Sequence, residues 1–280
     1  MNQGVVLFAS NNTKINYVKQ AQYLAKRVRK YMDLPTSLVT DVDIKNKFPD
    51  AEDAFDQIIF TNTLKHNYAN KRYHDGTLSN RILPFNNGNR ADAYFLSPYD
   101  ETLVMDTDYI ICNDILNNCF SQKNDLCLYD DAVHLGIHNG TPEFKKISDT
   151  SVDFYWATVV FFRKTKMNEI YFNLVKHIQE NYMHYRSVYQ FKSNVYRNDF
   201  AFSIAAHIMN GYQKGNIIGN LPGKHFYSID KDLCHNIKDD EIVILLEKSQ
   251  RLGEYTLTKT KGMNIHVMNK FSLERVIDNK

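Results

Sequence analysis

Asp106 and Asp108 flank a single threonine directly after a short apolar run. That run, residues 102–105, is rich in apolar and β-branched residues and is too short for an ordinary helix, so we expect a buried strand. A second apolar run begins at Tyr109 and leaves both carboxylates between two buried segments. Because burying an unpaired carboxylate costs free energy, the pair should hold a cation or face a cleft. The alternative is an Asp-Thr-Asp turn exposed to water, since Asp is common in turns.

Composition and motifs argue against several classes of protein. The 280 residues include 34 basic and 32 acidic side chains, a net charge of +2, so the chain lacks the overall charge of a nucleic-acid binder, although a local basic face stays open. Neither GxGxxG nor a P-loop motif occurs, which argues against a dehydrogenase and a P-loop enzyme. No apolar run reaches membrane-spanning length and no basic leader opens the chain, so we expect a cytoplasmic protein without a membrane partner.

The cysteines fit the same picture. They show no CxxC pair and no zinc spacing: Cys112, Cys119, Cys127 and Cys234. Because Cys112 lies in an apolar run, we expect it to be a small buried thiol. Reduced thiols fit an intracellular compartment.

The start of the chain predicts a strand, a polar turn, a helix and a second strand, at residues 5–9, 10–13, 18–32 and 37–40. The polar turn contains residue types that cap helices. A strand, helix and strand in succession make a parallel sheet, and the turn then lies at the carboxyl edge where open α/β sheets bind ligands. Backbone N–H groups at a helix start can bind phosphate, so the candidates are Ala9, Ser10 and Asn11.

Further along, apolar runs predict strands at residues 55–60, 155–162, 241–246 and 263–268, and helices begin near Thr165 and Asp199. Residues 91–96 predict a short helix, whereas the polar stretch 65–90 and most of residues 117–153 predict irregular segments. The sequence shows no internal repeat and no flexible linker. We therefore expect one α/β domain with a mixed, mostly parallel sheet flanked by helices.

These elements, taken in order, resemble a GT-A glycosyltransferase, most closely the retaining family of glycogenin and related galactosyltransferases. LVMDTD resembles that family's LYLDAD strand with its DxD motif, and FDQIIF is similar to the third strand. YWATVVFF is similar to FNSGVLLF, and IHVMNK resembles the C-terminal metal and phosphate segment. The chain also resembles small glycosyltransferases of tailed phages, which show similar departures from the family. The resemblance implies sugar transfer from a UDP-sugar, with retention of the anomeric configuration.

The resemblance implies a metal site formed by Asp106, Asp108 and His266, with Thr107 beside the nucleotide. A divalent cation would act there as a Lewis acid for the diphosphate leaving group. Carboxylates suit Mg²⁺ or Mn²⁺, and an imidazole ligand favours Mn²⁺. A lone strand histidine more often makes a structural hydrogen bond, and that alternative stays open for His266.

The resemblance also implies a donor site. Tyr17 stands where the family's tyrosine stacks on uracil, and Arg90 and Lys270 correspond to cations that reach the donor phosphates. Asp199 corresponds to the Asp of the family's DQ pair, near the sugar, and is a candidate catalytic residue together with the DxD carboxylates. Each has an ordinary alternative: a partly exposed helix residue for Tyr17, solvated cations for Arg90 and Lys270, and a helix N-cap for Asp199.

Three positions depart from the family. Trp156 and Ala157 replace its Asn-Ser, and Phe200 replaces the Gln of DQ. The residues that would recognise the sugar and the acceptor therefore differ from the family's.

A second candidate metal pair, His134 and His138, has helical spacing. Gly136 and Gly140 argue against a stable helix there, which makes this site the weaker of the two.

Basic and aromatic residues interleave in two segments: Lys71, Arg72 and Arg81 with Tyr68 and Tyr73, then Arg186, Lys192 and Arg197 with Tyr182, Tyr185, Tyr189, Phe191 and Tyr196. Such a set can hold a phosphate backbone and stack on an exposed base. An enzyme acting on a base within duplex DNA must extrude it. Hydroxymethylcytosine in phage DNA is thus one candidate acceptor; a protein, lipid or saccharide acceptor is the alternative.

The sequence therefore predicts a single domain over residues 1–280, with a nucleotide-binding half at 1–114 and an acceptor-side half at 115–280. The predicted activity is a hexosyl- or pentosyltransferase using Mn²⁺ or Mg²⁺. Two other classes stay open: a nucleotidyltransferase, which also uses paired carboxylates, and a nucleotide- or glycan-binding module without turnover. The sugar and the oligomeric state are left open.

Overall fold

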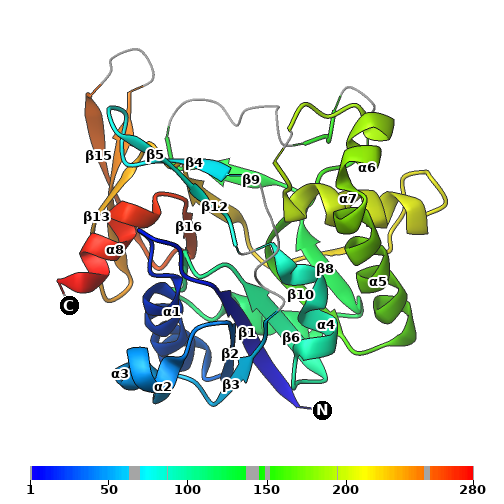
Figure 1. Cartoon of the computed structure of the whole chain (residues 1–280), viewed down its shortest axis with the longest axis horizontal. Coiled ribbons are helices and arrows are strands. Elements are labelled where there is room, and N and C mark those ends of the chain that lie inside the picture. Colours follow the sequence, from blue (N-terminus) through cyan, green and yellow to red (C-terminus); the bar gives the residue numbers. More distant parts are fainter. Residues whose placement is uncertain are drawn as a thin grey trace.

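The computed structural model describes residues 2–62, 70–86, 88–136, 145–148, 152–193, 195–248 and 253–279. A seven-stranded sheet forms its centre, in the order β11–β8–β10–β6–β1–β2–β3 (Figure 1). These strands are, in that order, Gly219–Asn220, Leu126–Tyr129, Trp156–Arg163, Glu101–Met105, Gln3–Ala9, Thr36–Thr40 and Gln57–Phe60. Neighbours run parallel except at β10, which is antiparallel to both β6 and β8. The predicted mixed, mostly parallel sheet is confirmed.

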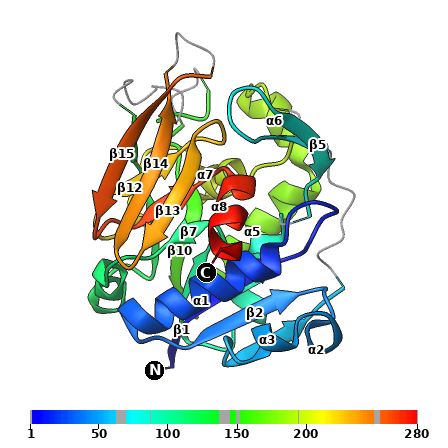
Figure 2. The ribbon, with the colours of Figure 1, turned by 90° about the vertical axis from the view of Figure 1, so that its left-hand side faces the viewer.

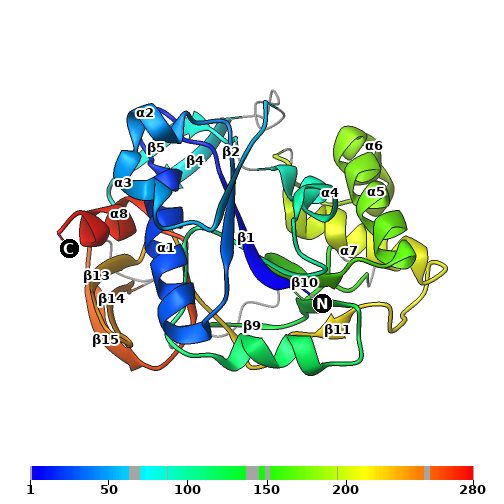
Figure 3. The same ribbon diagram turned by 90° about the horizontal axis from the view of Figure 1, so that it is seen from below.

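Helices cover both faces of this sheet (Figure 3). On one face α1 (Tyr17–Met32) packs on β1 and β2, with α8 (Lys270–Asp278) beside it. On the other face lie α4 (Ala93–Leu96), α5 (Lys166–Glu180) and α7 (Asn198–Met209). Shorter helices are α2 (Ile44–Lys47), α3 (Pro49–Glu52), α6 (Tyr182–Tyr189) and the 3-10 turns η1 (Asn89–Asp92) and η2 (Ile115–Ser121). None of the described helices is long and apolar enough to cross a membrane.

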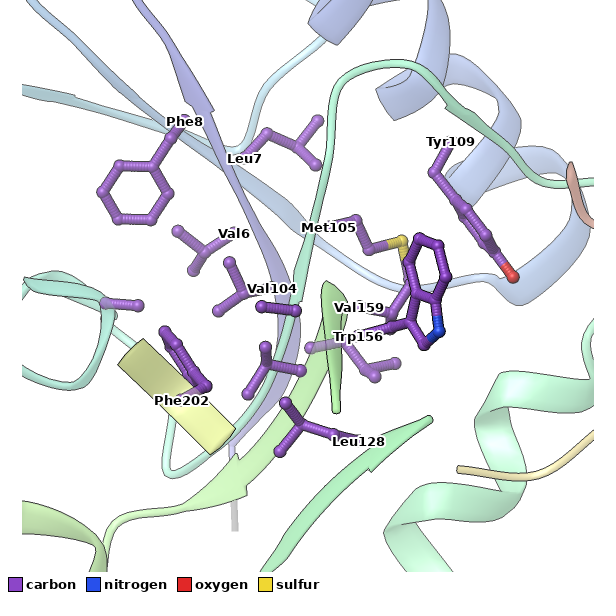
Figure 4. Close-up of a cluster of buried hydrophobic side chains, with 14 of the residues drawn as sticks. Val6, Leu7, Phe8, Val104, Met105, Tyr109, Leu128, Trp156, Val159 and Phe202 are labelled. Atoms are coloured by element: carbon purple, nitrogen blue, oxygen red, sulfur yellow. The ribbon is translucent and has the colours of Figure 1, made fainter. Parts of the chain in front are cut away.

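The central strands are buried on both sides. Every residue of β6 is buried, as are six of the seven residues of β1. Figure 4 shows Val6, Phe8 and Val104 on the face that Phe202 of α7 covers, and Leu7 on the opposite face. Parallel strands covered on both faces read as continuous apolar runs, which is why the sequence predicted them.

A second, four-stranded sheet lies against the end of the first, in the order β7–β16–β12–β9. Its strands are Tyr109–Ile110, Ile265–Val267, His225–Ser228 and Ala132–His134. A third, antiparallel sheet contains β13 (Leu233–Lys238), β14 (Glu241–Glu247) and β15 (Tyr255–Lys261), with α8 beside it (Figure 2). The predicted strands at 241–246 and 263–268 are confirmed, whereas β8, β9, β12, β13 and β15 were not predicted.

The predicted irregular segment at 65–90 is wrong for its described part. Strands β4 (Asn70–His74) and β5 (Asn80–Pro84) form an antiparallel hairpin there. Within these strands only Tyr73 and Leu83 are buried. A hairpin with one buried side chain per strand has no apolar period, so its sequence reads as a loop.

The start of α1 also differs from the prediction. The helix begins at Tyr17, and the side chain of Asn16 accepts a hydrogen bond from the Lys19 N–H as its cap. The polar turn at 10–13 therefore precedes the cap. The four cysteines are buried thiols that form no disulfide, as expected for Cys112.

Candidate active site

The DxD segment lies where the two larger sheets meet. Strand β6 ends at Met105, and the Asp106 N–H donates to the carbonyl of Thr158 near the start of β10, at 2.9 Å. The Tyr109 N–H then donates to the Asp106 carbonyl at 3.0 Å, which turns the chain into β7 of the second sheet. Both aspartates are therefore held in a turn between paired strands.

Strand β16 brings His266 to this turn. It pairs antiparallel with β7, and the Val267 N–H donates to the Asp108 carbonyl at 2.9 Å. His266 Nε2 then lies 3.3 Å from Asp108 Oδ2 and 3.9 Å from Asp106 Oδ2. One ligand atom from each of the three residues lies within 4.8 Å of the others, close enough to hold one metal ion.

The His266 ring is also fixed from behind. Its Nδ1 lies 3.3 Å from Thr158 Oγ1, a hydroxyl in β10. Metal-binding histidines are commonly oriented through a hydrogen bond at the second ring nitrogen. The structural hydrogen bond and the ligand role are thus compatible in His266.

Each DxD carboxylate has a cation partner from a distant part of the chain. Lys270 Nζ lies 2.6 Å from Asp108 Oδ2, and Arg90 forms an ion pair with Asp106. The Asp108 side chain is only 2% exposed, whereas that of Asp106 is 30% exposed. Buried charges of this kind need such partners. The alternative, that Arg90 and Lys270 are solvated cations, is wrong.

The ion pairs set the charge states. Burial acts to raise the pKa of Asp108, but Lys270 and then His266 hold it well below its usual range. Burial acts to lower the pKa of Lys270, but Asp108 raises it above its ordinary value. Burial lowers the pKa of Arg90 to about 10. Asp108, Lys270 and Arg90 are therefore all charged at neutral pH.

Asp199 forms a second charged cluster beside the first. It is the second residue of α7, so it is not the helix cap. Its carboxylate accepts from the Ala157 N–H at 2.9 Å and from Arg197 at 2.7 and 3.1 Å. Arg90 donates to the Ala157 carbonyl, which joins the two clusters. Burial acts to raise the pKa of Asp199, but Arg197 and the Ala157 N–H hold it below its ordinary value.

These residues line one cavity of about 400 Å³. The predicted site residues in its wall are Tyr17, Arg90, Asp106, Thr107, Asp108, Asp199, His266 and Lys270. Tyr17 is buried and not partly exposed, with its hydroxyl 3.3 Å from that of Tyr73. Tyr17 and Lys270, which are 253 positions apart in the sequence, thus line the same cavity.

Three predicted donor residues are not in the wall. Ala9 and Ser10 are buried at the end of β1. The Asn11 side chain is used inside the turn, where it accepts from the Val18 N–H at 3.0 Å and donates to Asn16 Oδ1 at 3.1 Å. Phe8, one residue before Ala9, lines the cavity instead.

The sequence did not single out several wall residues. Among them are three aromatic residues and one acidic residue: Phe8, Phe85, Tyr227 and Asp230. The unpredicted hairpin adds Lys71 and Tyr73 to the wall. The interleaved basic and aromatic pattern did mark Lys71 and Tyr73, though for an acceptor. Nothing in the sequence pattern marks Asp230, which follows the unpredicted strand β12.

Of the second candidate metal pair, His134 and His138, the structure describes His134 alone. His134 Nε2 lies 3.1 Å from Asp232 Oδ2, and Asp232 is already bonded to the N–H groups of Ile229 and Glu247. His138 lies outside the described residues. Within the described part of the chain, Asp106, Asp108 and His266 are the one cluster of this kind placed to hold a metal.

The aromatic residues predicted to face an acceptor are largely in the core. Tyr182, Tyr189 and Phe191 are buried, and Phe191 stacks on Phe200 with ring centroids 4.4 Å apart. Tyr68 lies outside the described residues. Of the predicted set, the cavity wall contains Lys71, Tyr73, Tyr196 and Arg197.

No protein-family model and no curated protein matches the chain. The structure is similar to the glycosyltransferase GlyE of Streptococcus pneumoniae TIGR4, at 13% identity over 79% of this chain and 45% of GlyE, with a TM-score of 0.45. It is similar to the galactosyltransferase LgtC, solved with donor and acceptor sugar analogues, at 12% identity over 72% of this chain and 70% of LgtC, with a TM-score of 0.45. It is also similar to mouse xyloside xylosyltransferase 1, at 9% identity over 79% and 85%, with a TM-score of 0.47.

The three similar structures are all glycosyltransferases by their names. The chain spans less than half of the length of GlyE.

Proposed function

We propose that the protein is a metal-dependent glycosyltransferase that takes a sugar from a UDP-sugar. One observation carries the proposal: Asp106, Asp108 and His266 converge in a cavity whose wall also contains two buried cations, Arg90 and Lys270. Breaking the bond between a sugar and a diphosphate leaves negative charge on the diphosphate. A site with a divalent metal and fixed cations stabilises that charge.

The donor set fits a divalent metal. Two carboxylates and one imidazole, with their ligand atoms within 4.8 Å of one another, offer oxygen and nitrogen ligands that suit Mn²⁺ and also Mg²⁺. When bound, the metal supplies a Lewis acid for the leaving group. We propose Mn²⁺ because of the imidazole.

The cations of the wall provide the remaining positive charge. Arg90 and Lys270 now pair with Asp106 and Asp108. Both cations are held beside the carboxylates, so a diphosphate bound at this position would lie within their reach as well. Charge-assisted hydrogen bonds from them orient the phosphates and stabilise the leaving group.

Asp199 is placed to act on the sugar. Its carboxylate is charged, buried and fixed by Ala157 and Arg197. It can accept a hydrogen bond from a sugar hydroxyl or stabilise the cationic anomeric carbon. Tyr17 also lines the cavity, and we propose that its ring stacks on the base.

In the overall reaction the bond from the anomeric carbon to the diphosphate oxygen breaks, and its electron pair leaves with UDP. The acceptor oxygen forms the new bond and loses its proton. The family resemblance favours retention. Asp230 in the wall is the alternative, since a carboxylate that serves as general base would give inversion. NMR of the first-formed product decides, and an inverted linkage would contradict the resemblance.

Turnover tests the function. The protein is incubated with a panel of UDP-sugars and MnCl₂, and released UDP is measured against an EDTA control. Release that depends on Mn²⁺ supports a glycosyltransferase. Pyrophosphate release from a nucleoside triphosphate would indicate a nucleotidyltransferase, and UDP binding without release would indicate a binding module.

For the acceptor, we propose hydroxymethylcytosine in phage DNA as the most specific candidate. Its support is the presence of Tyr196 and Arg197, from the second basic and aromatic segment, in the cavity wall. Radiolabelled sugar should enter DNA that contains 5-hydroxymethylcytosine, but not unmodified DNA, and transfer should weaken as salt rises. No label in modified DNA at low salt would point to a saccharide, lipid or protein acceptor. We propose a reducing compartment such as the cytoplasm, since the four cysteines are thiols and form no disulfide.

A further inference from the structure

The β4–β5 hairpin is fixed to the rest of the molecule at several points. Tyr73 is buried, and its hydroxyl lies 3.3 Å from that of Tyr17 in α1. Asp75 makes a two-point ion pair with Arg275 of α8, with both contacts at 2.8 Å. The Thr77 N–H donates to the Tyr255 hydroxyl at 3.0 Å. These contacts hold the hairpin in one position as part of the cavity wall.

Lys71 lies two residues before Tyr73 on β4, so both side chains point to the same face of the hairpin. Its Nζ is 5.5 Å from the ring centroid of Tyr73 and 5.4 Å from that of Phe85. Cation–π contacts at this distance favour one position for the ammonium group. Lys71, Tyr73 and Phe85 all line the cavity.

The other cations of the cavity are already paired: Arg90 with Asp106, Lys270 with Asp108 and Arg197 with Asp199. Lys71 has no ion pair among the described residues, and more than a third of its surface is exposed. An ammonium group without a counter-ion in the cavity wall is available to an anionic group of a ligand.

We propose that Lys71 is a phosphate-binding residue of the donor site, which contacts the diphosphate of UDP. The inference rests on the proposed function. The Tyr17–Tyr73 hydrogen bond joins the hairpin to the residue that would stack on the base. Lys270, the cation that would reach the phosphates, lines the same cavity as Lys71. Lys71 therefore lines the same cavity as the residues proposed to bind the base and the phosphates.

Calorimetric titration with UDP and with uridine, both in MnCl₂, tests this assignment. Lys71→Met keeps the apolar stem on the rings and removes the charge. We expect the Lys71→Met variant to bind UDP about tenfold more weakly, because one charge-assisted hydrogen bond is lost. Its affinity for uridine should not change. Lys71→Arg should restore most of the UDP affinity. Arg72→Met is the matched control, since Arg72 is the next residue on β4, is exposed and does not line the cavity.

The outcomes separate this assignment from the proposed function. If wild-type protein binds UDP well but Lys71→Met binds it equally well, the assignment is wrong and the proposed function stands. If wild-type protein does not bind UDP, both are wrong. If Arg72→Met weakens UDP binding as much as Lys71→Met, the effect is one of general charge, and the assignment is again wrong. Thermal unfolding of each variant shows that the hairpin is intact.

Discussion

Asp108 is the most deeply buried charge among the three candidate metal ligands, and its carboxylate contacts Lys270 and His266 at once. We predict that Asp108→Asn lowers Mn²⁺-dependent turnover by about 100-fold or more, since a Lewis acid at the leaving group is worth several kcal/mol. The fold should survive, although Lys270 loses its counter-charge at a cost of about 3 kcal/mol. Steady-state rates and circular dichroism measure both effects.

A matched control is Asp125→Asn. Asp125 also makes an ion pair, with Arg163, but its side chain is 49% exposed and does not line the cavity. The Asp125→Asn variant should keep full activity. If the Asp108→Asn variant keeps the Mn²⁺-dependent turnover of the wild-type protein, the proposed metal site is wrong.

His266 should set the choice of metal more than the rate. In His266→Ala two carboxylates remain, so we predict weaker Mn²⁺ binding and a smaller preference for Mn²⁺ over Mg²⁺, with a milder loss of activity than in Asp108→Asn. Titration of both metals by calorimetry measures the preference. An unchanged ratio of the two affinities would show that the imidazole is not a ligand and serves only the hydrogen bond to Thr158.

At the scale of residues, the DxD carboxylates could be predicted because they follow a buried strand, whereas His266 and Lys270 were candidates only through the family resemblance. The sequence could not predict their pairing, since Arg90 reaches Asp106 only once η1 and β6 are placed. Asp199 was predicted to lie near the sugar, with a helix cap as the alternative, and neither reading included the Ala157 N–H of another element, which its carboxylate binds. Contacts between elements leave no local pattern in the sequence.

Among the elements, α8 places Lys270. Asn269 caps this helix by accepting from the Ser272 N–H at 2.9 Å, and it donates to the carbonyls of Asp230 and Asp232 at 2.9 and 2.8 Å. We predict that Asn269→Ala lowers the unfolding free energy by about 1–3 kcal/mol, because a cap and two buried hydrogen bonds are lost. UDP binding should weaken as well, because Lys270 is displaced.

The comparison is Thr165→Ala. Thr165 caps α5 by accepting from the Asn168 N–H at 3.3 Å, and it does not line the cavity. This variant should lose stability but keep its UDP affinity. Equal UDP affinities in the two variants, measured by calorimetry, would show that α8 does not place a donor residue.

The contact between α7 and β10 should weaken in acid. The pKa of Asp199 is held below its ordinary value of 3.8, so its stabilising contribution is fully present above about pH 4 and is lost as pH falls through the lower value. We predict that Asp199→Asn is less stable than wild type at pH 6 and that the difference shrinks below pH 4. Urea unfolding at several pH values measures this. A difference that does not change with pH would mean that the carboxylate charge contributes nothing.

The success of prediction also differs between elements. The strands β1, β6 and β10 were predictable because both faces are buried and their sequences are apolar throughout. The β4–β5 hairpin was not, because most of its side chains are exposed. Short strands such as β9 are stabilised by partners far away in the sequence, so they offer no period to detect.

At the scale of the whole molecule, the cavity exists only where separate sheets and helices meet. The seven-stranded sheet contributes the end of β6, and the four-stranded sheet contributes β16. Helices α1, α7 and α8 add Tyr17, Asp199 and Lys270. The order of elements predicted the class of fold, but the second sheet, on which His266 depends, became visible only in three dimensions.

The central claim is that Asp106, Asp108 and His266 hold a divalent metal that binds the diphosphate of a UDP-sugar. The most direct test is calorimetric titration of UDP into the wild-type protein in MnCl₂ and, separately, in EDTA. We predict that UDP binds at least about tenfold more tightly with Mn²⁺, because the metal contributes a strong contact to the phosphates. The same affinity in EDTA, or no binding of UDP in either solution, would contradict the claim.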